Sequence, residues 1–127
     1  MSNFFNTFNG KVLDDAGTYV SDDFKKFQIA MRHEVKRIAK EIGANLVSFA
    51  KGHYDMSWFV ERDGHYVYCH YGVMGIRSKV MLDHNGAMFI RTAANEHDFR
   101  GGSNNFTSFT NIKNMMDRLL KREHRPC

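Results

Sequence analysis

Apolar residues recur at steps of three and four between Ser21 and Gly43, which predicts one long amphipathic helix. Ser21 suits the N-cap position, and Gly43 suits the C-terminal stop. Asp22 and Asp23 place negative charge at the positive end of the helix dipole. The stripe expected to face the core consists of Phe24, Phe27, Met31, Val35, Ile38 and Ile42.

After this helix, apolar and polar residues alternate, which is typical of half-buried β-strands. The expected strands are Asn45–Lys51, Met56–Arg62, His65–Tyr71, Lys79–His84 and Ala87–Thr92. Asp63-Gly64 and Asn85-Gly86 are dipeptides that favour type I′ turns, so they predict two β-hairpins.

The first hairpin can be assigned residue by residue, because a two-residue loop pairs Arg62 with His65. One face of it is expected to be core and pairs Val60 with Val67, Trp58 with Cys69 and Met56 with Tyr71. The opposite face carries Phe59, Tyr66, Tyr68 and His70. These aromatic residues are either covered, by a Phe-rich N-terminal arm or a second helix, or exposed for binding. We expect Tyr68 to be exposed.

The ends of the chain complete the expected fold. Residues 1–20 predict an arm that packs by Phe4, Phe5 and Phe8, with one short strand at Lys11–Leu13. Residues 93–108 are polar and predict a loop, which is expected to be tight at Gly101-Gly102. A last helix, for which Ser108 and Thr110 are the alternative N-caps, is expected to bury Phe109, Ile112, Met116, Leu119 and Leu120. Residues 1–127 should therefore form a single α+β domain, an antiparallel sheet of four to five strands packed by a long N-terminal helix and a C-terminal helix.

Length and composition indicate the cellular compartment in which the chain is expected to fold. A length of 127 residues is enough to bury a core without a disulfide or a structural metal. Cys69 and Cys127 have no disulfide-framework spacing, and no apolar run approaches the length of a membrane span. We therefore expect a cytoplasmic protein.

Catalytic chemistry has little support in the sequence. The seven histidines have no spacing typical of a metal site, and Cys69 is expected in the core rather than activated. No nucleophile elbow, phosphate-binding glycine loop or paired-carboxylate site is present in the sequence. We expect no catalytic residue, metal or cofactor.

Two surfaces are candidates for binding. The first is the aromatic face of the hairpin, which resembles the stacking platforms of single-stranded nucleic-acid binders. The second is a basic strip on the outer side of the long helix. The strip consists of Lys26, His33, Lys36, Arg37 and Lys40. Part of the net charge of +4 lies on this helix, and part lies on the last 17 residues.

The segment Phe89–Asn104, FIRTAANEHDFRGGSN, resembles a segment of small proteins from phages and mobile elements. The upstream segment Gly52–Val60 fits the same resemblance, which covers about residues 50 to 120. The resemblance implies an accessory protein that interferes with a host system, as anti-CRISPR proteins do by binding a nuclease or its nucleic-acid site.

Three functions follow as hypotheses. The first is a non-enzymatic, phage-encoded binding protein that occludes the nucleic-acid-binding surface of a host RNA-guided nuclease. Its expected binding residues are Tyr66, Tyr68, His70, Arg91, His97, Asp98 and Arg100. The second is direct DNA or RNA binding through the basic strip and the aromatic face. The third is a small nuclease that uses Glu96, His97 and Asp98 with a divalent metal.

Overall fold

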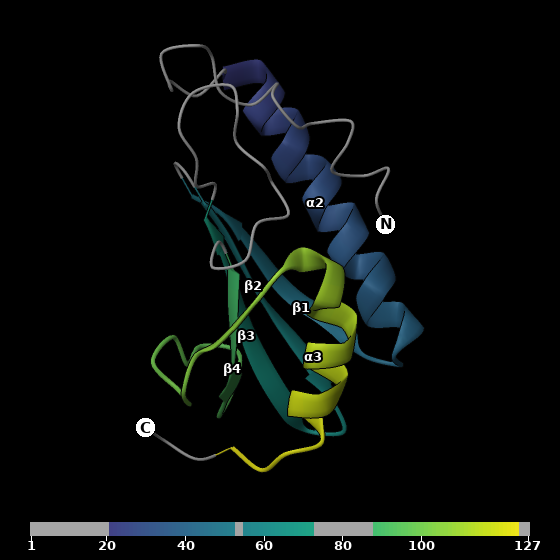
Figure 1. The fold of residues 1–127 in the computed structure, drawn as a ribbon, viewed down its shortest axis with the longest axis vertical. Helices are drawn as coiled ribbons and strands as arrows, with labels where there is room; N and C mark the ends of the chain where they lie inside the picture. Colours follow the sequence, from purple (N-terminus) through teal and green to yellow (C-terminus); the bar gives the residue numbers. More distant parts are fainter. Residues whose placement is uncertain (1–20, 53–54, 73–87, 125–127) are drawn as a thin grey trace.

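A single antiparallel sheet with two helices on one side forms the fold, in a computed structural model that describes residues 21–52, 55–72 and 88–124 (Figure 1). The elements are α2 (Ser21–Glu41), β1 (Asn45–Lys51), β2 (Asp55–Arg62), β3 (His65–Gly72), β4 (Met88–Ala93), β5 (Asn105–Thr107), the 3₁₀ helix η2 (Phe109–Asn111) and α3 (Ile112–Leu120). The five strands lie in sequence order, and each pairs with the next. This architecture confirms the α+β class. The expected arm 1–20, with its strand Lys11–Leu13, and the expected strand Lys79–His84 lie outside the described residues.

Helix α2 packs against the sheet with the predicted stripe, of which the Phe24 side chain lies outside the part that the structure describes. Phe27, Met31 and Val35 are fully buried, and Ile38 is 1% exposed. The helix ends as expected at Gly43, whose φ of 70° is favourable for glycine. The Gly43 and Ala44 amides donate hydrogen bonds to the carbonyls of Lys40 and Ala39 at 3.1 and 2.9 Å. These bonds provide partners for carbonyl groups that lack one at the end of a helix.

The β2–β3 hairpin has the register predicted from its turn. Arg62 pairs with His65 and Trp58 pairs with Cys69. Asp63 and Gly64 both have positive φ, at 54° and 80°, as a type I′ turn requires. At this end of the sheet Arg62 donates to the Asp117 carboxylate of α3 at 2.7 Å and to the Ile42 carbonyl after α2 at 2.9 Å. The hairpin is thereby tied to both helices.

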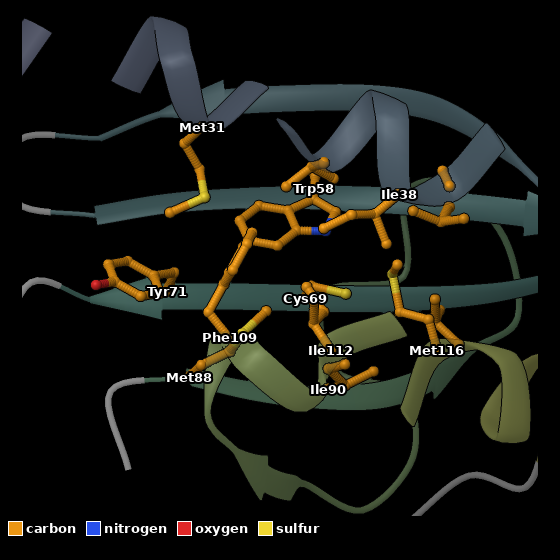
Figure 2. Packing of buried hydrophobic residues seen from close by; sticks show 14 of the residues in the cluster. Met31, Ile38, Trp58, Cys69, Tyr71, Met88, Ile90, Phe109, Ile112 and Met116 are labelled. Carbon is orange, nitrogen blue, oxygen red and sulfur yellow. The ribbon is translucent and has the colours of Figure 1, made fainter. Parts of the chain in front are cut away.

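The main core lies between the sheet and the two helices (Figure 2). Trp58 is 1% exposed and stacks on Phe49 at a ring-centroid distance of 5.6 Å. Cys69 is fully buried beside it, and this burial raises the pKa of its thiol more than the Trp58 side chain lowers it. The interpretation of Cys69 as a core residue is confirmed.

The C-terminal part departs from the prediction in two ways. Strand β5 forms within the segment expected to be a loop, and it adds to the edge of β4. The last helix begins as η2 and continues as α3, and the Ser108 side chain makes no capping hydrogen bond. Ser108, one of the two expected caps, is nevertheless the N-cap residue of η2, and Phe109, Ile112, Met116, Leu119 and Leu120 are buried as predicted. Within residues 21–52, 55–72 and 88–124, no helix combines the length and apolarity needed to cross a membrane.

Candidate binding site on the aromatic sheet face

The side of the sheet opposite the helices carries a second cluster of apolar residues, which we call the aromatic face. Alternation along β2, β3 and β4 turns every second side chain to this side, away from the main core. Strand pairing then aligns these residues across the sheet: Phe59 with Tyr68, His70 with Phe89, and Phe89 with Phe106. The aromatic face consists of Phe59, Tyr66, Tyr68, His70, Phe89 and Phe106, together with Phe99 from the 94–104 loop.

The rings of the aromatic face form one contiguous chain across four strands. Phe59 lies 5.0 Å from Tyr68, and Tyr68 lies 6.2 Å from Phe89, between ring centroids. Phe89 contacts Phe106 at 6.1 Å and stacks on His70 at 5.2 Å with an angle of 18° between the rings. These distances are within the range of favourable aromatic pairs, so each ring restricts the position of its neighbours.

Phe99 covers the centre of the aromatic face. Its ring packs edge-on against Phe59 at 5.2 Å and against Tyr68 at 5.7 Å. As a result Phe59 is only 2% exposed and Tyr68 only 8% exposed. The expectation that Tyr68 is an exposed binding residue is therefore wrong, because the loop after β4 folds back over it. Phe99 itself is 55% exposed and presents its outer side to solvent.

Arg91 fastens the loop to the face. Its guanidinium carbon lies 4.8 Å from the ring centroid of Tyr68 and 5.3 Å from that of Phe89, which are cation–π distances. The same guanidinium donates to the Phe99 carbonyl and, at 3.2 Å, to the Asn104 side chain. Arg91 thus lies in the predicted site, but its contacts are within the chain.

Asp98 stabilises the 94–104 loop by hydrogen bonds to the backbone of the loop. Its carboxylate accepts the amide of Ala94 at 2.8 Å and the amide of Arg100 at 3.2 Å. The pKa of Asp98 is lowered, chiefly by the Ala94 amide, with further contributions from the Arg100 amide and the nearby His124 and Arg91, which together outweigh its burial. Asp98 is therefore a structural residue of the site.

Two glycines let the loop approach β4 closely. The Gly102 amide donates to the Thr92 carbonyl at 2.9 Å. A Cβ atom on Gly101 would lie 2.5 Å from the same carbonyl and 2.7 Å from the Asp98 carboxylate. Because a backbone carbonyl cannot move aside easily, this position requires glycine. The close approach agrees with the tight loop expected at these two residues.

His70 lies at the margin of the face and is held by an acidic neighbour. Its Nε2 atom lies 2.7 Å from a carboxylate oxygen of Asp55, and its side chain is 28% exposed. Tyr66 is likewise only partly buried. These two predicted site residues lie on the aromatic face and are accessible from solvent.

The residues of the metal-nuclease hypothesis do not converge. His97 is 82% exposed and lies 3.6 Å from Glu96, whereas the Asp98 carboxylate turns away to the loop amides and His124. In the part of the chain that the structure describes, no three His, Cys, Asp or Glu side chains gather as metal ligands. Glu96, His97 and Phe99 instead line a shallow pocket of about 260 Å³ at the β1 end of the aromatic face.

The basic strip lies on α2, on the helix side of the sheet. All five residues of the strip are exposed: Lys26, His33, Lys36, Arg37 and Lys40. Arg37 is paired with Glu34 and Glu41, and these carboxylates raise its pKa. Part of the charge of the strip is thereby neutralised. The two surfaces predicted to bind are on opposite sides of the molecule, so one flat partner cannot contact both.

In comparisons with protein-family models, with curated proteins and with solved structures, nothing matches this chain. Function is therefore inferred from the arrangement of the residues. The aromatic face combines a rigid ring network, an arginine at its centre and exposed rings at Phe99 and Phe106. This combination is suited to binding.

Proposed function

We propose that the chain is a non-enzymatic binding protein that docks onto a protein partner through its aromatic face. The observation that supports this most directly is the exposure of large rings on a sheet side that no helix of the described chain covers. Phe99 is 55% exposed and Phe106 is 65% exposed, and both continue the ring network of the buried residues beneath. Exposed aromatic side chains on a rigid base are typical of interface anchors.

The charges around the aromatic face favour a protein partner over a polyphosphate. Asp55, Glu61 and Glu96 lie on or beside it, against the basic residues Arg91 and Arg100. The Arg91 guanidinium is engaged by Tyr68, Phe89 and the loop. A face of mixed charge gives phosphate groups little net attraction, whereas it suits the polar rim of a protein interface.

The partner in this proposal is a host nuclease that targets nucleic acid, and the chain would occlude its nucleic-acid-binding surface. The basis for this choice is the resemblance of Phe89–Asn104 to small phage proteins. That segment contains Phe89, Arg91, Asp98 and Phe99, which build the centre of the aromatic face. The segment that carries the resemblance is therefore also the segment that shapes the proposed interface.

An interference assay tests this function. Cells that carry an RNA-guided nuclease directed at a plasmid are transformed with that plasmid, with and without the chain. We expect the chain to restore transformation, and Phe99→Ala and Arg100→Ala each to weaken binding to the purified nuclease by about 1 kcal/mol or more. The matched controls are Ile29→Ala, which removes another exposed apolar side chain, and Lys36→Ala on α2.

Three results would contradict the proposal. If the chain protects the plasmid at amounts far below those of the nuclease, it acts by turnover and is an enzyme. If a panel of nuclease types cleaves equally with and without a molar excess of the chain, the nuclease is not its partner. If the Ile29 and Lys36 controls weaken binding while the Phe99 and Arg100 variants do not, the interface lies on α2.

A further inference from the structure

A groove runs along the edge of the sheet between β5 and α3, next to the aromatic face. It consists of two adjoining hollows of about 590 and 540 Å³. Both hollows follow the same two elements, since their linings contain consecutive residues, Asn105 and Phe106 on β5 and Arg118 and Leu119 on α3. We call this feature the β5–α3 groove. It plays no part in the interface proposed above except at its rim, where Phe106 belongs to both.

The β5–α3 groove carries unneutralised positive charge. It is lined by Arg118 on α3 and by Arg122, two residues past the end of that helix, and among the described residues Glu123 is the single acidic residue of the lining. Within the described residues neither arginine has a carboxylate partner, and the one hydrogen bond of the Arg118 guanidinium is to the sulfur of Met115 at 2.9 Å. This differs from Arg37 on α2, which is held between two glutamates. The groove therefore offers two cations to an incoming anion.

Beside these charges the groove presents an exposed ring and polar groups. The Phe106 ring is 65% exposed, and Phe89 holds it from behind at 6.1 Å. Asn114 also lines the groove, and its amide has no hydrogen-bond partner among the described residues. A flat apolar ring, free amide donors and acceptors, and paired arginines are the groups that bind a base and the phosphates next to it.

We propose that the β5–α3 groove binds single-stranded nucleic acid, with a base stacked on Phe106 and phosphates paired with Arg118 and Arg122. An acidic peptide would meet the same charges, but it would have to pair with the edge of β5. That strand is three residues long, and so short an edge is a poor template for strand addition. A nucleotide, in contrast, can stack its base on the Phe106 ring and form hydrogen bonds with the Asn114 amide.

The test measures binding of a fluorescent oligo(dT) of about 12 nucleotides, a length within the range of such sites. We expect Phe106→Ala to weaken binding at least about fivefold, since one stacked base contributes about 1 kcal/mol or more. We expect the double variant Arg118→Ala/Arg122→Ala to reduce the slope of log affinity against log salt concentration by about 1.4, because each phosphate contact on a single strand contributes about 0.7. The matched control is Lys36→Ala/Lys40→Ala, which removes two exposed cations at the same spacing from α2.

Three outcomes would overturn this proposal. Absence of oligo(dT) binding at about 50 mM salt, where phosphate contacts are strongest, would exclude the site. A larger loss from the Lys36/Lys40 control than from the arginine variant would assign binding to the α2 strip. Equal competition by poly-glutamate and by unlabelled oligo(dT) would show that the groove selects carboxylates as readily as nucleotides. Phe99→Ala should leave oligo(dT) binding unchanged, which separates this site from the protein interface.

Discussion

Removing the Asp98 carboxylate should loosen the loop that covers the aromatic face. Asp98→Ala deletes two hydrogen bonds to backbone amides, at 2.8 and 3.2 Å, and a charge that faces His124 at 3.5 Å. A hydrogen bond to an ionised group contributes about 1.5 to 3 kcal/mol. The Asp98 side chain is 19% exposed, and water can replace it at amides on an exposed loop, so we expect a net loss of about 2 kcal/mol.

Two measurements check this loss. Chemical denaturation gives the change in the free energy of unfolding, and a loss of about 2 kcal/mol corresponds to a fall in melting temperature of about 6 to 10 °C for a chain of this size. Hydrogen exchange at the Ala94 and Arg100 amides reports opening of the loop alone. Asp98→Asn retains an acceptor without the charge and should fall between wild type and Asp98→Ala. Glu123→Ala is the control, since it removes one negative charge from an exposed residue.

The pH dependence follows from the same geometry. Folding lowers the pKa of Asp98, so its stabilising effect is fully present above the carboxyl pKa of the unfolded chain, near 4. This stabilising effect is lost as the pH falls from the pKa of the unfolded chain through the lower pKa that Asp98 has in the folded state. The difference in stability between wild type and Asp98→Ala should therefore shrink below about pH 4. A loss under about 0.5 kcal/mol at neutral pH, with unchanged amide exchange, would refute the structural role of this carboxylate.

Three further substitutions test the rest of the fold. Gly64→Val should cost about 1 kcal/mol or more, because a β-branched residue is strained at a φ of 80°, and unchanged denaturation would contradict the turn type. Val35→Ala should cost about 1 to 4 kcal/mol in chemical denaturation, since Val35 is fully buried against the sheet, and a loss below about 0.5 kcal/mol would mean that α2 faces another way. In a Cys127→Ser variant, Cys69 should react with a thiol reagent only on unfolding, because it is buried and its thiol pKa is raised; rapid labelling of the native protein would contradict this.

Local patterns in the sequence predicted α2 and the β2–β3 hairpin because their determinants are close together in the chain. Asp63-Gly64 defines the turn, and the turn defines every pair in the hairpin. Strand β5 escaped prediction because three residues with one apolar side chain show no alternation. It forms because the preceding loop returns the chain to the free edge of β4.

In the candidate site, too, local patterns predicted only what nearby residues determine. Alternation placed Tyr68 on the face opposite the core, but it contains no information about what lies above that face. The cover comes from Phe99, which is 31 positions along the chain and is brought back by contacts of Arg91 and Asp98. Phe89 and Phe106 join the face only through strand pairings between segments whose register no short turn defines within the described residues.

The sequential order of the strands has a consequence for synthesis on the ribosome. Each strand from β1 to β5 pairs with the one just before it, so the sheet can extend in the order in which the chain emerges. Until α3 has emerged, however, Met88 and Ile90 lack the cover that α3 gives them in the finished core. Docking of α3 and closure of the ion pair between Arg62 and Asp117, 55 positions apart, must come last. Docking of α3 onto the sheet is thus the step that completes the core.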